Sequence, residues 1–116
     1  MGPLTPMQVE ARLIALDRDL EDSFSELEEA EYEYHTLKGE YEIGMAGARM
    51  ALIETGKMTV SEKDDRALLA NQERYQALMI AEARAKAARA NVMKLRAQAD
   101  IVRSMGASLR SAQELA

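Results

Sequence analysis

Apolar and small residues recur through the first half of the chain at alternating steps of three and four residues. The series consists of Leu13, Leu16, Leu20, Ser23, Leu27, Ala30, Tyr34, Leu37, Tyr41, Gly44, Ala48 and Ala51. This spacing places its members along one face of an α-helix and is typical of a coiled-coil seam. Thr5, Pro6 and Gln8 supply a capping box and a favourable first residue, so the pattern predicts a helix over residues 6–54.

The same spacing returns in the second half of the chain, after a change of phase expected near Leu68, Tyr75 and Met79. The series consists of Leu78, Ala81, Ala85, Ala88, Val92, Leu95, Ala99, Val102, Gly106 and Leu109. Half of these residues are alanine or glycine, which lets two helix axes approach closely. A second long helix is therefore predicted over residues 61–113.

A short connector, residues 55–60, separates the two predicted helices. Thr55 and Gly56 suit the end of the first helix, because glycine readily takes the left-handed conformation that closes a helix. Two pairs of residues offer an N-cap for the second helix: Thr59 with Glu62, and Ser61 with Asp64. A connector this short favours antiparallel neighbours. The predicted fold of residues 1–116 is one all-α domain, a long antiparallel two-helix hairpin of the coiled-coil type.

Two helices alone bury only a narrow stripe each, and chains with thin cores generally need oligomerisation or covalent links. The chain has no cysteine, so it has no disulfide to add. Many apolar residues also lie off the two seams: Ile14, Phe24, Tyr32, Ile43, Met45, Met50, Leu52, Ile53, Leu69, Met79, Ile80, Ile101 and Met105. We therefore expect a homo-oligomeric helical assembly. The residues expected to form its contacts are Leu78, Ala85, Ala88, Val92, Leu95, Ala99 and Val102.

Glycines cluster near the end of the first predicted helix. Gly39, Gly44 and Gly47 each weaken a helix by up to about 1 kcal/mol relative to alanine. Bending or close packing is expected at these positions.

Composition narrows the classes of function. No apolar run approaches the roughly 20 residues that cross a bilayer, and residues 1–7 lack the regions of a signal peptide. We expect no membrane association and a cytoplasmic protein, in the host cytoplasm if a phage encodes it. His35 is the only histidine, and no nucleophile, zinc spacing or phosphate loop accompanies it. We expect no enzymatic activity, no catalytic residue, no metal and no cofactor.

Charge divides the chain into an acidic and a basic half. Residues 1–56 carry thirteen acids and four bases, net −9, whereas residues 57–116 carry seven acids and eleven bases, net +4. Within residues 84–110, seven bases face a single acid, Asp100. Four arginines there are spaced by seven residues, two helical turns, and form one stripe: Arg89, Arg96, Arg103 and Arg110.

Two interpretations of this arginine stripe follow from the sequence. Arginine binds phosphate well because its planar guanidinium donates paired hydrogen bonds. The residues expected to contact nucleic acid are Arg89, Lys94, Arg96, Arg103, Ser104, Ser108 and Arg110. Alternatively, the arginines pair across the coiled coil with an acidic stripe of the first helix, which consists of Asp19, Glu26, Glu33 and Glu40. Arg103 and Arg110 extend towards the open end of the hairpin and are the better candidates for an external anion.

The end of the second helix has a distinctive order of residue types. An acid, an apolar pair, a base, a serine and a glycine precede another apolar residue and another base: Asp100, Ile101, Val102, Arg103, Ser104, Gly106, Leu109 and Arg110. With the glycine-containing loop at residues 54–62, this makes residues 48–113 resemble small coiled-coil proteins of bacteriophage recombination modules and, more distantly, UvsY-type recombination mediators. The resemblance implies a multimeric helical assembly that binds single-stranded DNA.

The resemblance also implies assistance in loading a recombinase where a single-strand-binding protein is already bound. The sequence thus predicts a DNA-binding recombination accessory protein, with both of those proteins as further partners. The competing hypothesis is a structural or adaptor coiled coil, such as a phage assembly or chaperone component, that binds protein partners only. Salt-dependent binding to an oligonucleotide distinguishes the two.

Overall fold

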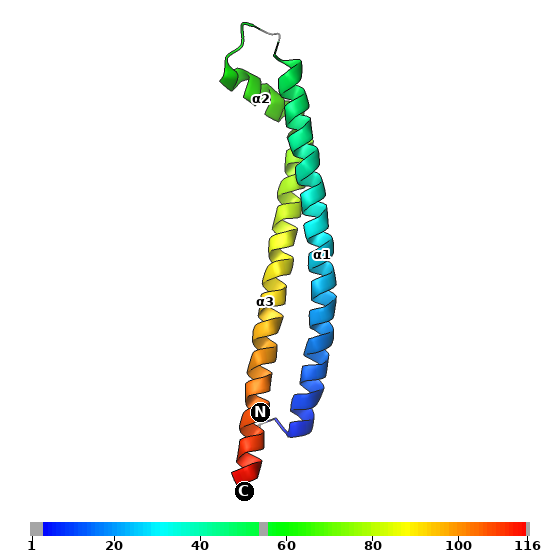
Figure 1. The fold of residues 1–116 in the computed structure, drawn as a ribbon, viewed down its shortest axis with the longest axis vertical. Coiled ribbons are helices and arrows are strands. Elements are labelled where there is room, and N and C mark those ends of the chain that lie inside the picture. The colour runs from blue at the N-terminus through cyan, green and yellow to red at the C-terminus, as the bar shows by residue number, and fades with distance from the viewer. Residues whose placement is uncertain (1–3, 54–55, 116) are drawn as a thin grey trace. The chain divides into compact units, whose positions relative to one another are not determined.

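The computed structural model describes residues 4–53 and 56–115, and all regular structure in these residues is α-helical. The helices are α1 (Pro6–Ala51), α2 (Val60–Ala70) and α3 (Gln72–Leu115) (Figure 1). The predicted all-α class is confirmed. None of these helices is long and apolar enough to span a membrane.

The predicted caps form at the start of α1 and α2. The Thr5 amide donates to Gln8 Oε1 at 2.8 Å, and the Gln8 amide donates to Thr5 Oγ1 at 3.2 Å. Thr59 and Glu62 form the same reciprocal pair at the start of α2, with distances of 3.1 and 3.4 Å. Of the two possible caps for the second helix, the chain uses Thr59.

The helix ends differ from the predicted ones. α1 ends at Ala51 instead of 54. Of the two expected closing residues, Thr55 lies outside the described residues, and Gly56 does not take the expected left-handed conformation. α3 continues to Leu115, past the predicted end at 113. The prediction of one uninterrupted second helix is wrong, because Asn71 separates α2 from α3.

The chain divides into two compact units, one formed by Met1–Glu28 with Ala87–Ala116 and the other by Glu29–Lys86. We call them the terminal unit and the middle unit. In each unit, α1 runs antiparallel to α3. In Figure 1, the blue part of α1 lies beside the orange part of α3 in the terminal unit, and the cyan part of α1 lies beside the yellow part of α3 in the middle unit. Contacts between the helices follow this order. In the terminal unit they are Val9 with Gly106, Asp17 with Arg103 and Ser23 with Asn91; in the middle unit, Glu33 with Arg84 and Tyr41 with Tyr75.

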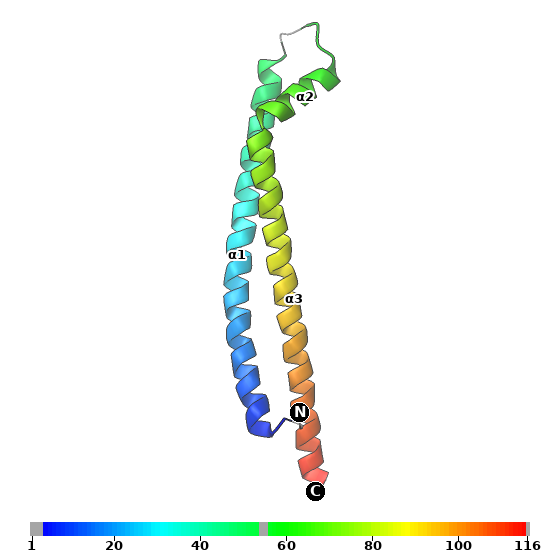
Figure 2. The ribbon, with the colours of Figure 1, turned by 180° about the vertical axis from the view of Figure 1, so that it is seen from behind.

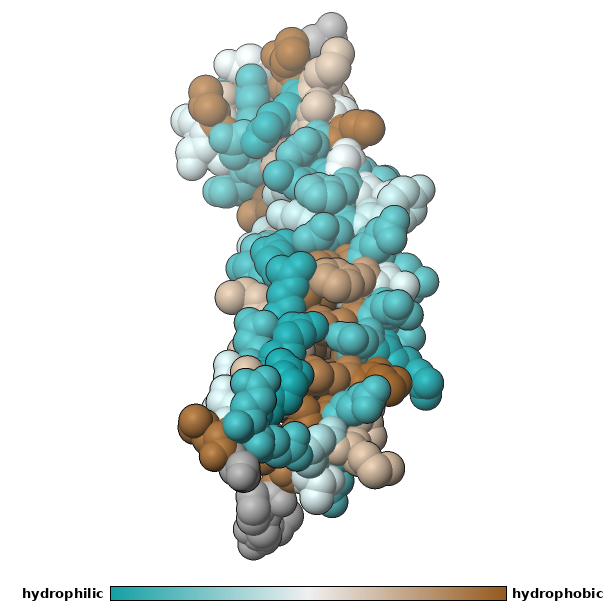
Figure 3. Space-filling view, turned by 60° about the horizontal axis from the view of Figure 1, so that its bottom comes forward, coloured by the Kyte–Doolittle hydropathy of each residue, from teal (hydrophilic) through white to brown (hydrophobic). Residues whose placement is uncertain are grey.

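The core of the terminal unit consists of Val9, Leu16, Ala99 and Val102. Partly buried leucines pack against it: Leu4, Leu13, Leu20, Leu95 and Leu109. Ala99 is fully buried, and a Cβ atom added to Gly106 would lie 3.0 Å from Val9 Cγ1. Small residues of α3 thus allow close approach, as expected. Figure 3 shows the resulting stripe of hydrophobic residues bordered by hydrophilic side chains.

The two predicted seams correspond to the buried faces of α1 and α3. Every predicted seam residue from Leu13 to Ala48, and all ten of the second series, are buried or half-buried. Ala51 is exposed. The spacing reflects the packing because only one face of each helix meets the other helix.

The expected change of phase in the second helix is wrong. Leu68, Tyr75 and Met79 are exposed, whereas Ala67 and Asn71 are buried. Steps of four and seven lead from Ala67 through Asn71 to Leu78, the first predicted member of the series, and Arg74 at the intervening seam position is exposed. The seam therefore keeps its register across the break.

The residues expected to join separate copies are instead used within one chain. Five are buried there, Leu78, Ala85, Val92, Ala99 and Val102, and Ala88 and Leu95 are half-buried. Most apolar residues off the seams are exposed, among them Ile14, Tyr32, Ile43 and Ile101. Met45 is buried and Leu52 is half-buried.

Candidate nucleic-acid interface

The arginine stripe lies along one flank of the α3 seam, within the terminal unit. Each of its arginines directly follows a seam residue: Arg89 follows Ala88, Arg96 follows Leu95, Arg103 follows Val102 and Arg110 follows Leu109. All four arginines are exposed. The seven-residue spacing therefore correctly predicted that the four arginines lie in one row along α3, beside its seam.

Arg103 lies between two carboxylates. Its Nη2 is 3.5 Å from Asp17 Oδ1 on α1, and its Nη1 is 3.2 Å from Asp100 Oδ1 one turn earlier on α3. The Arg103 side chain remains 54% exposed, and those of Asp17 and Asp100 are 60% and 77% exposed. Exposed ion pairs of this kind contribute at most about 1 kcal/mol each. The guanidinium is thus positioned but still open to solvent.

Arg96 contacts an aromatic ring instead of an acid. Its guanidinium carbon lies 5.0 Å from the centroid of the Phe24 ring on α1. A cation at this distance is attracted to the face of the ring by about 0.5–1 kcal/mol at an exposed site. The contact also covers part of Phe24, one of the apolar residues off the seam.

The partners of the stripe differ from those that the sequence suggested. Asp17 and Phe24 each directly follow a seam residue of α1, as Arg103 and Arg96 do on α3. In an antiparallel pair, each flank of one helix meets the equivalent flank of the other. The acidic stripe that includes Asp19 and Glu33 precedes the seam residues and lies on the opposite flank.

On that opposite flank, α1 meets few cations. Glu33 Oε1 is 3.8 Å from Nη1 of Arg84, which itself precedes a seam residue of α3. In the terminal unit, Asp19, Asp22 and Glu26 line a shallow groove with Ser23, Asn91 and Leu95. Asn91 Nδ2 donates to Ser23 Oγ at 3.0 Å in this groove. A polyanion is repelled from this flank, so an anion would approach from the arginine flank.

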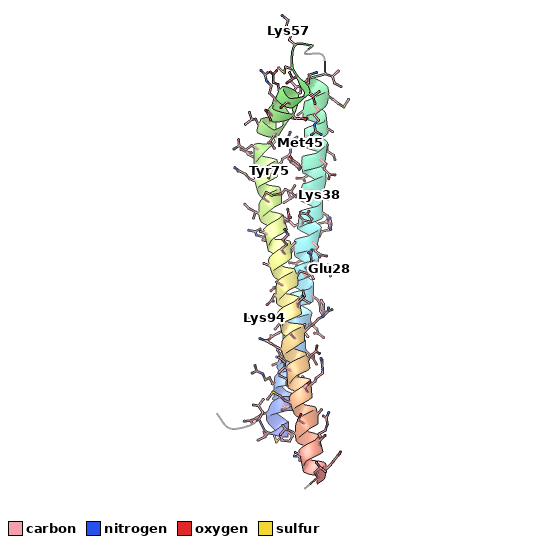
Figure 4. The ribbon with its side chains drawn as sticks, turned by 90° about the vertical axis from the view of Figure 1, so that its left-hand side faces the viewer. Glu28, Lys38, Met45, Lys57, Tyr75 and Lys94 are labelled. Carbon is pink, nitrogen blue, oxygen red and sulfur yellow. The ribbon has the colours of Figure 1, made fainter. Side chains whose placement is uncertain are left out.

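Arg110 lies at the last turns of α3 beside Glu10. Both line a shallow hollow of about 330 Å³ together with Pro6, Val9, Leu13 and Gly106. Within residues 4–53 and 56–115, no ion pair is formed by Arg110. The same is true of Lys94, an exposed residue labelled in Figure 4.

Ser104 and Ser108 are also exposed, but they lie away from the arginine stripe. They line an apolar groove of about 570 Å³ with Leu4, Asp100, Ile101, Met105 and Leu109. Ser108 and Arg110 are two residues apart, which is about 200° around a helix. The structure thus places the four arginines on one flank and the two serines on another face. Lys94, two residues before Arg96, also lies off the arginine flank.

Asp17 and Phe24 are the site residues that sequence reasoning missed. Their signal is present in the sequence, because Glu10, Asp17 and Phe24 recur at intervals of seven, as the arginines do. The antiparallel alignment decides which flank of α1 faces the stripe, because equivalent flanks of the two helices meet.

His35, the one histidine of the sequence, lies on α1. The His35 ring lies 5.2 Å from that of its neighbour Tyr34. No group of three histidine, aspartate or glutamate residues in the described parts of the chain is placed to hold a metal ion. In the terminal unit, the arginine stripe forms a row of exposed guanidinium groups. Comparison of the chain with protein-family models, with characterised proteins and with solved structures finds no match.

Proposed function

We propose that this chain is a phage-type recombination mediator or accessory protein that binds single-stranded DNA as a homo-oligomer and assists recombinase loading. The observation that carries the proposal is the exposed row from Arg89 to Arg110, which lies in a segment, residues 84–110, whose one acid is Asp100. In this proposal the two units belong to one continuous coiled-coil hairpin, and several hairpins assemble.

The carboxylates beside Arg103 do not prevent phosphate binding. Both ion pairs are exposed and weak, and a guanidinium has five N–H donors, more than the two used here. A phosphate can replace Asp17 or Asp100 at small cost, because each released carboxylate returns to water. In the free protein the acids then serve to hold the arginine extended.

Several copies of the stripe are needed for useful affinity. One chain offers only a few phosphate contacts, whereas adjacent copies on one strand raise the effective concentration of each successive contact. Exposed apolar residues of the terminal unit, Ile14, Ile101 and Met105, provide surface for such copies. The acidic flank with Asp19 and Glu26 then remains for basic regions of protein partners, a recombinase or a single-strand-binding protein.

Titration of a fluorescent single-stranded oligonucleotide at several salt concentrations tests the proposal. We expect affinity to fall steeply as salt rises, and the slope of log K against log salt to decrease by about 0.7 for each phosphate contact removed. Arg103→Ala with Arg110→Ala weakens binding, whereas Arg66→Ala, an exposed base on α2, is the matched control. Light scattering on the same samples reports the assembly.

A second candidate function is a structural or adaptor coiled coil that binds proteins only. The specific observation in its favour is that Arg96 lies on Phe24 and Arg103 contacts Asp17, so the stripe already has intrachain partners. In that case the arginines specify how the helices align. An oligomer that shows no DNA binding at low salt would favour this function over the first.

A further inference from the structure

The break between α2 and α3 consists of a single residue. Asn71 has φ −112° and ψ 18°, and the helices on either side end and begin directly next to it. Its amide still donates to Ala67 O at 3.1 Å, and its carbonyl accepts from the Tyr75 amide at 2.9 Å. Figures 1 and 2 show α2 turned away from the direction of α3 at this point.

Nothing in the local sequence requires a break here. The chain has no glycine or proline between Gly56 and Gly106, and the residues around the break are Ala-Leu-Leu-Ala-Asn-Gln-Glu-Arg-Tyr, mostly good helix formers. The seam also keeps its register from Ala67 through Asn71 to Leu78. One straight helix would therefore keep these residues on a common face.

A tertiary contact accounts for the bend. The Asn71 side chain is buried and its Nδ2 donates to Gly44 O on α1 at 3.1 Å and to Ala67 O at 2.9 Å. Arg74 Nη1 donates to Asn71 Oδ1 at 2.8 Å. A side chain that takes up a helix carbonyl in this way competes with the backbone ladder and kinks the helix.

Gly44 makes room for this contact. A Cβ atom at position 44 would run into Asn71 Oδ1 and press against the Arg74 side chain. At Gly47, by contrast, an added Cβ meets nothing within 4 Å. Nearer the start of α2, Asp64 Oδ1 lies 3.1 Å from Arg49 Nε of α1, and both side chains are about half exposed. Such a pair holds α2 only weakly.

From this geometry we infer that Asn71 is a switchable joint, bent while its side chain is seated on Gly44 and straight when that contact is lost, so that α2 and α3 become one helix. The inference does not depend on DNA binding. A partner that draws Asn71 away from Gly44 would thereby lengthen α3 by the whole of α2.

Distance measurements between two spin labels test the joint. The chain has no cysteine, so Ser61→Cys and Ala83→Cys, both at exposed positions of the middle unit, introduce the labels cleanly. In one continuous helix these 22 residues span about 33 Å, and the bent form gives a shorter distance. We expect Asn71→Ala and Gly44→Ala each to move the main population to about 33 Å.

Gly47→Ala is the matched control and is expected to leave the distance distribution unchanged. Circular dichroism on the same samples separates straightening, which keeps or raises helical content, from unfolding. The inference is overturned if both variants keep the short distance, or if both lose helical content instead of lengthening.

Discussion

Gly106 of α3 lies directly against the side chain of Val9 of α1, with room for no more than a tightly placed Cβ atom between them. The seam of the terminal unit is therefore narrow at this point, because the interhelical distance depends on the absence of a side chain.

A large residue at position 106 should destabilise the terminal unit. We expect Gly106→Leu to lower the free energy of unfolding by about 1–3 kcal/mol, because it overpacks the contact with Val9. Ala107→Leu, at the exposed neighbouring position, should change stability by no more than about 0.5 kcal/mol. Urea unfolding followed by circular dichroism measures both, and equal stability of the two variants would contradict the close packing.

The glycines of α1 should respond differently to alanine. An added Cβ at Gly39 or Gly47 meets open space, so Gly39→Ala and Gly47→Ala should each stabilise the protein by up to about 1 kcal/mol through helix propensity. Gly44→Ala should not, because its Cβ collides with the seated Asn71. Thermal unfolding compares the three variants. Equal stabilisation by all of them would show that position 44 is not specially packed.

The Arg103–Asp17 pair should contribute little to stability. A double-mutant cycle with Arg103→Ala and Asp17→Ala should give a coupling energy of no more than about 1 kcal/mol, because both side chains are more than half exposed. The coupling should fall further when salt is raised. Urea unfolding at two salt concentrations measures it. A coupling of several kcal/mol would mean that Arg103 is committed to the fold and is not available to phosphate.

The apolar groove of the terminal unit should influence assembly. Ile101→Ser with Met105→Ser removes exposed apolar surface without touching the buried seam, so the apparent molar mass in light scattering should fall. Ser104→Ala, in the same groove, removes no apolar surface and serves as the control. An unchanged mass in the double variant would place the contacts between copies elsewhere.

Much of the candidate site could be foreseen from spacing alone. Arginines seven residues apart must lie on one side of a helix, and the structure has them in an exposed row. Spacing within α3 does not by itself give the contacts of Arg96 with Phe24 and of Arg103 with Asp17, because they also depend on which flank of α1 faces the stripe. The predicted antiparallel alignment already implied that flank, whereas we expected the acidic stripe of the other flank as the partner. The predicted serines lie on another face for a different reason, because Ser108 is about 200° around the helix from Arg110.

The sequence by itself determined the helices and their buried faces, because a helix that packs on one side has to repeat its apolar residues at steps of three and four. Residues as different as Ser23, Tyr34 and Gly106 all lie in the seam for this reason. Only the tertiary structure decided that the second helix breaks at Asn71. The residues around that position favour a helix. The carbonyl of Gly44, which accepts a hydrogen bond from the Asn71 side-chain Nδ2, lies 27 residues away along the chain.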